Sequence, residues 1–569
     1  MRIGRGHRDY RDITLKVQVR GILRRTQNSK HYGNPYISLH DQIQLQDAIF
    51  RQASRLDSLH KSTKSWRNYY RLKSANHGFT VAIKDNIVTA TLPTTCASRI
   101  LKGFCGPEDA TVTKLLEKAG MVLVAKTNMD EFGMGSHSTH SAYGPVVNGG
   151  SVKSDHLSVG GSSGGSALAV AKNLAHIAIG TDTGGSVRLP AAYMSLVGFK
   201  PSYGMISRTG VIPYANSLDT VGILAKSVVD IRLTFDMLQR PDVSDPTCLD
   251  QSSRERIRAS KHKRRRVILT SKLFVTRVPF SKRLLEAQGL APLASRRRNL
   301  AVTASQKHHT RRIGVPLEYN IEEMHPLVRW AWMATLSHLQ HVYKFEIVPI
   351  SLPSTKHALS AYYILAPAEA SSNLAKYDGV RYGRKRTAPA DGGGDDNPLY
   401  STYRYDNFGP EVRRRILLGT YSLSAGAMDN YFIQAQKIRR LVQQDFDAVF
   451  RMPNPLRDGT EANPHGVDMI IVPTAPSPPP YIESLKSSRP VERYMNDIFT
   501  VPASLAGLPA ISVPAPAHPD HPWDPEVAVG MQVIGQYGDD FSVIYFAQNF
   551  LSNFHPKDMR RTVETKILS

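Results

Sequence analysis

Two glycine-rich turns, each carrying a serine, restrict the fold and chemistry of this chain more than any other feature. The first is GGSSGGS at 160–166 and the second is DTGGSVRLP at 182–190. Their serines, Ser162 and Ser186, lie 24 positions apart. Serine is a weak nucleophile until a base removes its proton, and flanking glycines let backbone N–H groups crowd round a developing oxyanion. The pair of turns therefore indicates a site built around a nucleophilic serine.

A lysine upstream of both turns could supply the base. Lys84 ends the strand-like apolar run FTVAIK at 79–84. A free lysine has a pKa near 10.4, but burial can lower that pKa by several units because a low dielectric disfavours the ammonium. A neutral Lys84 could then draw a proton from Ser186 through Ser162. The competing interpretation is a strand-end lysine that extends its charge into solvent.

The second turn also offers a candidate oxyanion hole. Backbone N–H groups of Thr183, Gly184 and Gly185 precede Ser186 and could point into one cavity. The alternative for such glycine-rich loops is phosphate binding before a helix. That alternative is disfavoured because the sequence has no GxxxxGK[ST] motif. A Ser–His–Asp hydrolase is disfavoured because no GxSxG elbow is present, whereas Ser–Lys arrangements are a recognised variant.

The pattern of apolar runs predicts an α/β fold with a layered sheet. Five short runs are typical of buried strands: 79–84, 121–126, 469–474, 510–515 and 527–535. An amphipathic helix is predicted over 109–120, with Gly120 as its C-cap. A helix buried on all sides is predicted over 166–180. Alternating strands and helices favour this architecture over an all-α or all-β fold.

Segments rich in proline, glycine or charge divide the apolar pattern at about 241–311, 387–398 and 452–466. The strand-like runs resume after each segment. We therefore expect a basic segment at 1–30 followed by one large domain, 31–569, that carries three surface insertions.

The net charge of +24 comes almost entirely from two segments. Residues 1–30 carry +7 and residues 251–312 carry +16, which leaves the rest near neutral. The first segment is interpreted as a mitochondrial transit peptide, with a disordered basic terminus as the alternative. For the second we expect a solvated loop, with RNA contact or an ill-defined exon boundary as alternatives.

Cofactor and membrane signals are weak in this sequence. Its three cysteines have no metal-ligand spacing, so no metal site is expected and a reducing compartment is favoured. No run of about 18 apolar residues predicts a transmembrane helix.

The two turns together, with their serine spacing, resemble the defining pattern of the amidase signature family. That resemblance implies a large mixed central β-sheet with helices on both faces and a Ser–cis-Ser–Lys triad. By position, it makes Ser186 the acylated nucleophile, Ser162 the bridging serine in a cis peptide, and Lys84 the base.

Later segments resemble one branch of that family, the A subunits of glutamyl-tRNA(Gln) amidotransferases. The segments that carry the likeness are 81–87, 94–98, 126–136, 369–383, 413–424 and 494–514. The likeness implies that Arg415 holds the α-carboxylate of glutamine, that Asp497 holds its α-amino group, and that Tyr362 lies near the site. A guanidinium does match a carboxylate in bidentate geometry, and an ammonium does require an anion.

The same likeness implies partners. It suggests a heterotrimer that also contains a B subunit plus a small third subunit in the mitochondrial matrix, in which ammonia from glutamine converts Glu-tRNA(Gln) to Gln-tRNA(Gln). ATP and Mg²⁺ would belong to the partner, which would also make most of the tRNA contact, and this chain would hold no cofactor. One alternative is a stand-alone amidase acting on another small or acyl amide, which has no need for Arg415 and Asp497. Another is a scaffold or RNA-binding subunit with a dead site, which the intact Ser186, Ser162 and Lys84 disfavour.

Overall fold

The structure is a computed structural model. It describes residues 33–39, 79–149, 156–268, 311–383, 401–459, 461–516 and 528–551. The expected basic segment 1–30, the insertion at 387–398 and most of the second basic segment lie outside the described residues.

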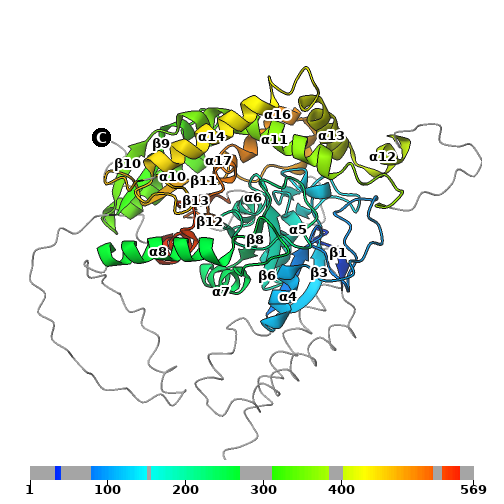
Figure 1. Ribbon diagram of the computed structural model, residues 1–569, viewed down its shortest axis with the longest axis horizontal. Coiled ribbons are helices and arrows are strands. Elements are labelled where there is room, and N and C mark those ends of the chain that lie inside the picture. Colours follow the sequence, from blue (N-terminus) through cyan, green and yellow to red (C-terminus); the bar gives the residue numbers. More distant parts are fainter. Residues whose placement is uncertain are drawn as a thin grey trace, which may run out of the picture.

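One mixed sheet of 11 strands forms the centre of the molecule, in the order β1-β3-β2-β6-β8-β7-β12-β13-β11-β9-β10 (Figure 1). Its strands are β1 (Tyr36–Leu39), β2 (Thr80–Lys84), β3 (Val122–Thr127), β6 (Ile177–Asp182), β7 (Val197–Lys200), β8 (Thr220–Ala225), β9 (Arg312–Pro316), β10 (Glu346–Ile350), β11 (Met469–Pro473), β12 (Ala510–Pro514) and β13 (Gly530–Ile534). Strands β2, β3 and β6 run parallel, as do β9, β10 and β11, while β7, β8, β12 and β13 pair antiparallel. A separate two-stranded sheet pairs β4 (Val147–Asn148) with β5 (Leu157–Ser158).

Side chains point alternately to the two faces of the sheet along each strand, and this divides the core into two clusters. In β2, Val81 and Ile83 join one large cluster of buried residues, whereas Ala82 joins a second cluster. This follows from the period of two along a strand. Every residue of β2 is buried, so both faces of the sheet must be covered by helices.

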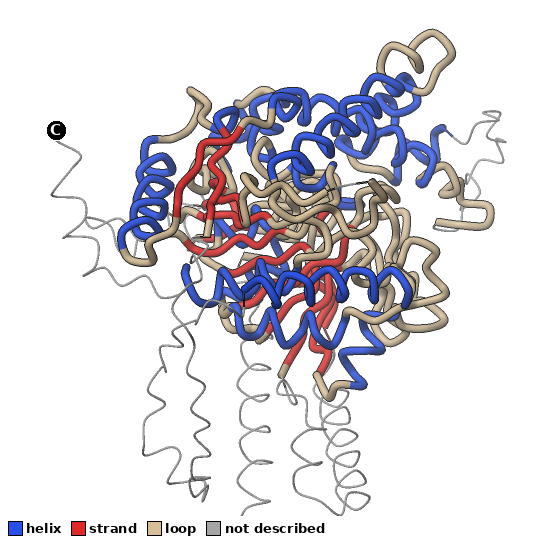
Figure 2. Tube along the Cα trace, turned by 60° about the vertical axis from the view of Figure 1, so that its left-hand side comes forward, coloured by secondary structure: helices blue, strands red, loops and turns tan. Residues whose placement is uncertain are grey.

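Helices cover both faces. They are α4 (Thr111–Lys118), α5 (Gly164–Ala171), α6 (Arg188–Tyr193), α7 (Val228–Leu238), α8 (Gln251–Ile268), α10 (Pro326–His341), α11 (Ala358–Asn373), α12 (Ser401–Asn407), α13 (Pro410–Ser422), α14 (Phe432–Val449), α15 (Ile482–Ser487), α16 (Pro490–Tyr494), α17 (Val501–Leu505) and α18 (Asp540–Phe546). Apolar residues of α5 join the cluster that contains Ala82, and those of α4, α7 and α10 join the other cluster. In the view of Figure 1, α11, α13 and α14 lie above the strands and α4, α7 and α8 lie toward the lower side, and apolar residues of all six join the cluster that contains Val81 and Ile83. Figure 2 shows helices both above and below the strands. The expected mixed sheet flanked by helices is confirmed.

The five predicted strands are confirmed as β2, β3, β11, β12 and β13, and the predicted helix over 109–120 as α4. The N–H of Gly120, at a φ of +86°, bonds back to the carbonyl of Glu117, so this glycine does help to end the helix. The prediction of one helix over 166–180 is wrong. Helix α5 ends at Ala171 and β6 begins at Ile177, because Asn173 adopts a left-handed φ of 56° that no helix continues through.

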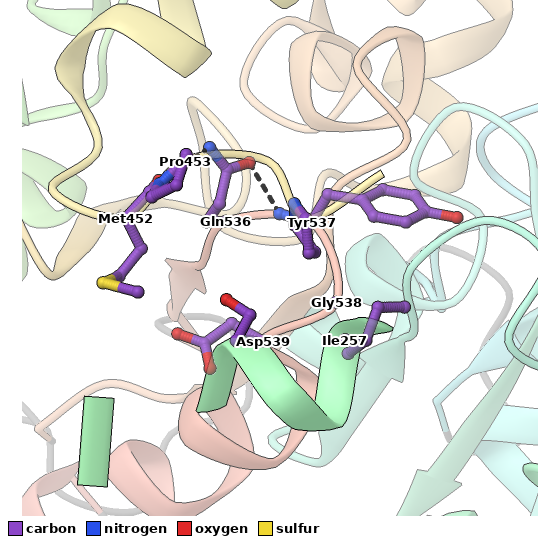
Figure 3. Close-up of a pocket in the computed structure, with 9 residues that line it drawn as sticks. Ile257, Met452, Pro453, Gln536, Tyr537, Gly538 and Asp539 are labelled. Atoms are coloured by element: carbon purple, nitrogen blue, oxygen red, sulfur yellow. Dashed lines mark hydrogen bonds between the residues drawn. The ribbon is translucent and has the colours of Figure 1, made fainter. Parts of the chain in front are cut away.

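The expectation of a solvated loop over 251–312 is wrong for residues 251–268, which form a helix. This helix is α8, and its residues Arg254 and Ile257 are buried. Arg254 donates to the carbonyls of Met205 (3.0 Å) and Arg240 (3.2 Å), which ties α8 to the chain segments that carry these two carbonyls. A pocket lies where α8 meets the segments around 452–455 and 536–539 (Figure 3). It shares no residue with the serine-bearing turns.

No helix in the described ranges is both long and apolar enough to cross a bilayer.

Candidate active site

The lysine and the second turn meet because β2 and β6 are parallel neighbours. Ile83 of β2 is in register with Ile179 of β6. The carboxyl ends of parallel strands meet at one edge of a sheet. Lys84 ends β2, and Thr181 is the last residue but one of β6, immediately before the turn that carries Ser186. The topology therefore brings two segments about a hundred residues apart to one edge.

Lys84 is fully buried, which decides against a solvent-facing strand-end lysine. Its Nζ lies 2.7 Å from Ser162 Oγ and donates to Thr181 Oγ1 at 3.0 Å. Burial lowers the pKa of Lys84 to about 7, although the carboxylates of Asp130, Asp182 and Asp219 partly oppose that shift. A substantial fraction of this amine is therefore neutral near pH 7 and able to accept a proton.

The two glycine-rich turns are in direct contact. The Gly161–Ser162 peptide bond is cis, and Ser162 lies just before α5. The N–H of the next residue, Ser163, donates to the carbonyl of Ser186 at 3.2 Å. Ser162 is 1% exposed and Ser186 is 9% exposed. The candidate bridging serine is therefore shielded from solvent, whereas the candidate nucleophile is slightly accessible to it. The structure thus gathers Lys84, Ser162 and Ser186 at one place.

A buried ion pair joins the two ends of the second turn. Arg188 and Asp182 are both fully buried, and their side chains pair at 2.9 Å and 3.0 Å. The Asp182 carboxylate also accepts the backbone N–H of Val187 at 3.2 Å. Because both groups are buried, removal of either partner would leave an uncompensated charge in the core, so the pair ties the start of the turn to α6.

The hydrogen-bond pattern of the second turn leaves its central N–H groups free to serve a ligand. The carbonyl of Gly184 accepts from Thr500 Oγ1 at 2.7 Å, and that of Gly185 accepts from the N–H of Leu189 at 2.8 Å. Within the described part of the chain, the N–H groups of Gly184, Gly185 and Ser186 donate to no protein acceptor. Buried N–H groups nearly always have a partner, so three consecutive unpaired ones suit an oxyanion.

Thr183, the remaining oxyanion candidate, is held by its side chain. Its Oγ1 donates to Asp219 at 2.7 Å, and the same carboxylate accepts the N–H of Tyr214 at 2.8 Å. Tyr362 lies directly above the turn, since a Cβ on Gly184 would be 2.8 Å from its hydroxyl oxygen. Glycine is therefore required at 184 by close approach rather than by its dihedral angles.

Arg415 is buried on α13 and held in a fixed direction. Its Nε donates to Glu411 at 2.9 Å and its Nη1 donates to the Tyr214 hydroxyl at 2.7 Å. Glu411 also accepts from the Tyr494 hydroxyl at 3.2 Å. The rings of Tyr363 and Tyr494 lie 5.3 and 5.7 Å from the guanidinium carbon, so aromatic rings and one carboxylate surround this cation.

Asp497 provides the opposite charge. Its carboxylate accepts from Ser136 Oγ at 2.7 Å and from the Tyr363 hydroxyl at 3.1 Å. Burial raises the pKa of Asp497 to about 6, and those two hydrogen bonds together with Arg415 limit the rise. The Tyr363 hydroxyl donates to Asp497 and the Tyr363 ring lies beside the Arg415 guanidinium, so Arg415 and Asp497 belong to one site.

Several contributors were not predicted from the sequence, among them Ser136, Tyr214, Tyr363 and Glu411. Glu411 precedes Arg415 by four positions on a helix, a spacing that could have identified it. Tyr363 is the neighbour of the predicted Tyr362 in AYY, and it is the one that touches Asp497. Ser136 and Tyr214 carry no local signal, because only the tertiary fold brings them here.

A cavity opens beside this charged pair. Its lining includes Ser136, His140, Glu411, Arg414, Arg415, Arg493 and Tyr494. Across the described ranges, no three His, Cys, Asp or Glu side chains gather as metal ligands would.

Comparison with known proteins gives the family. The sequence profile described as Amidase matches residues 43–287 and 281–544. The A subunit of the mitochondrial glutamyl-tRNA(Gln) amidotransferase of Ajellomyces capsulatus is 49% identical over 502 residues, covering 84% of this chain and 89% of the relative. That of Coccidioides posadasii is 51% identical over 488 residues, covering 83% and 88%. The crystal structure of the glutamyl-tRNA(Gln) amidotransferase A subunit from Thermotoga maritima is 32% identical, with a TM-score of 0.58 and 84% of each chain covered. The chain therefore belongs to the amidase family, in the branch that holds these glutamyl-tRNA(Gln) amidotransferase A subunits.

Proposed function

We propose that this chain is the glutaminase subunit of a mitochondrial glutamyl-tRNA(Gln) amidotransferase. The observation that carries the proposal is the buried contact of 2.7 Å between Lys84 Nζ and Ser162 Oγ beside the turn of Ser186. The charged pair of Arg415 and Asp497 supports an amino-acid substrate, because glutamine carries an α-carboxylate and an α-ammonium.

In the proposed acylation step, Ser186 Oγ attacks the side-chain carbonyl carbon of glutamine. Its proton passes to Ser162, whose own proton passes to neutral Lys84. The N–H groups of the second turn hold the oxyanion, which is the role for which we propose Thr183, Gly184 and Gly185. The intermediate then collapses, the C–N bond breaks, and the proton returns through Ser162 to the departing ammonia.

In the proposed deacylation step, water attacks the glutamyl ester on Ser186. Lys84 takes the proton of that water through Ser162, and then returns it to Ser186 as glutamate leaves. Throughout both steps, Arg415 holds the α-carboxylate, Asp497 holds the α-ammonium, and Tyr362 closes the site over the turn.

The destination of the ammonia is also part of the proposal. The relatives are named as A subunits of an amidotransferase in mitochondria. We place this chain in the mitochondrial matrix with a B subunit plus a small third subunit. We assign to the partner the ATP, the Mg²⁺ and most contact with Glu-tRNA(Gln). The ammonia would then convert Glu-tRNA(Gln) to Gln-tRNA(Gln) on that partner.

Ammonia release from glutamine by the complex tests this function. Wild type should release ammonia, Ser186→Ala should not, and Ser372→Ala, an exposed serine on α11, should match wild type. Absence of Ser186-dependent release from wild type would exclude the glutaminase. Faster hydrolysis of uncharged amides than of glutamine would instead favour a stand-alone amidase.

A further inference from the structure

We propose that Thr500 is a positioning residue for the oxyanion hole. By donating a hydrogen bond to the backbone carbonyl of Gly184, Thr500 orients the N–H of Gly185 toward the reacting carbonyl of the substrate. This inference rests on the proposed glutaminase function and assigns a role in it to a residue outside the triad and outside the groups that bind the substrate's charges.

The key contact is the hydrogen bond from Thr500 Oγ1 to the carbonyl of Gly184, at 2.7 Å. Thr500 is fully buried, so water does not compete for that carbonyl. The Thr500 hydroxyl has one hydrogen, and its other acceptor, the carbonyl of Asp497, is farther away at 3.1 Å. The bond to Gly184 is therefore the stronger of the two.

The geometry of the peptide bond links this contact to the direction in which the N–H of Gly185 points. The Gly184–Gly185 bond is trans, since the only cis bond among the described residues is Gly161–Ser162. A trans peptide is planar, with its C=O and N–H pointing in opposite directions. When Thr500 fixes the carbonyl of Gly184, it also fixes the N–H of Gly185 pointing away from Thr500. That N–H is one of the three in this turn with no protein acceptor among the described residues.

The absence of a side chain at Gly185 makes room for the Thr500 hydroxyl. Gly185 has a φ of +150°, which residues with a side chain rarely adopt. A Cβ at Gly185 would lie 2.2 Å from Thr500 Oγ1. The glycine therefore permits both the backbone conformation and the close approach of the hydroxyl.

Thr500 is itself firmly anchored. Its carbonyl accepts from Arg188 Nη1 at 2.9 Å, and Arg188 forms the buried pair with Asp182 that fixes the other end of the turn. Its N–H donates to the carbonyl of Asp497 at 3.1 Å. One short segment thus carries both the carboxylate proposed for the substrate ammonium and the hydroxyl that orients the oxyanion hole.

The test compares Thr500→Val, which keeps the side-chain shape but removes the hydroxyl, with Thr500→Ser, which keeps the hydroxyl. An oxyanion donor typically contributes 10²–10³-fold to rate, so misdirecting one should lower kcat by about 10–100-fold. KM for glutamine should change by less than about 3-fold, because the oxyanion forms only after binding. Thr500→Ser should stay within about 3-fold of wild type.

A second measurement separates this role from a merely structural one. The γ-semialdehyde of glutamate should form a tetrahedral adduct with Ser186, and its affinity should fall with kcat in Thr500→Val. The affinity of L-glutamate, which forms no such adduct, should not change. If Thr500→Val does not fold, as judged by thermal denaturation, Thr500→Ala takes its place in the same comparison.

Three results would overturn the inference: an undiminished kcat in Thr500→Val, an equal loss in Thr500→Ser, or equal losses of affinity for the aldehyde and for L-glutamate. Each of these leaves wild type active on glutamine. Failure of the proposed function is distinguishable, because wild type would then show no Ser186-dependent hydrolysis.

Discussion

Lys84 Nζ and Ser162 Oγ lie 2.7 Å apart although 78 positions separate the two residues in the chain. Both side chains are buried, so the amine has given up its hydration shell for the hydroxyls of Ser162 and Thr181. An ammonium in that position is costly, which is why the neutral form is accessible near pH 7.

Replacing Lys84 by methionine should abolish the proton relay while preserving the volume of the side chain. We expect kcat for glutamine hydrolysis to fall by about 10²–10⁴-fold, the range for loss of a general base. The matched control is Lys102→Met, at an exposed lysine, which should retain full activity. Ammonia release by the purified complex gives both values, and near-normal turnover in Lys84→Met would contradict the assignment.

The pH dependence of kcat/KM should show the titration of Lys84. Its pKa is lowered to about 7, so the amine is protonated and inactive as a base below that pH. Activity should therefore rise through about pH 7 and level off above it, as expected for an essential base in the free enzyme. A profile that is flat from pH 5 to 9, or that falls across this range, would be inconsistent with a lysine base.

Asp497→Asn should weaken substrate binding far more than turnover. The substitution removes the charge proposed for the α-ammonium, and a charge-assisted hydrogen bond of about 1.5–3 kcal/mol corresponds to a rise in KM of about 10–100-fold. In wild type, KM should also rise as the pH falls below about 6, because Asp497 then becomes protonated. Asp497→Asn should lose that pH dependence, whereas Asp236→Asn, at an exposed position, should keep it. An unchanged KM in Asp497→Asn would remove this residue from the binding site.

The two ion pairs of Arg188 and Arg256 should differ sharply in their contribution to stability. Arg188 is fully buried with Asp182, so Arg188→Met leaves an unpaired buried carboxylate and should lower the free energy of unfolding by about 3–5 kcal/mol. Arg256 pairs with Asp458 at the surface, with 51% and 94% of the side chains exposed, and Arg256→Met should cost at most about 1 kcal/mol. Denaturant unfolding measures the free energy of unfolding of both variants. Similar losses of stability in the two would contradict the idea that burial decides how much each ion pair contributes.

The strands were predictable where the apolar run was short and ended at a turn residue. The runs at 79–84 and 469–474 are examples, because their length suits a buried strand and not a helix. The run at 166–180 was misread because an apolar helix followed by an apolar strand has the same composition as one longer helix. The break between them depends on Asn173, whose left-handed backbone is not visible in the hydrophobic pattern.

The sequence by itself identified the groups that we propose to react, because Ser162 and Ser186 lie in glycine-rich turns and Lys84 lies at a strand end. It also pointed to Arg415 and Asp497 through family likeness. Only the tertiary structure decided how these groups are held. Thr500 meets Gly184 across 316 positions and Tyr363 meets Asp497 across 134. Such contacts form when distant segments are buried together by the packing of the sheet and its helices, and no local pattern of residues encodes that packing.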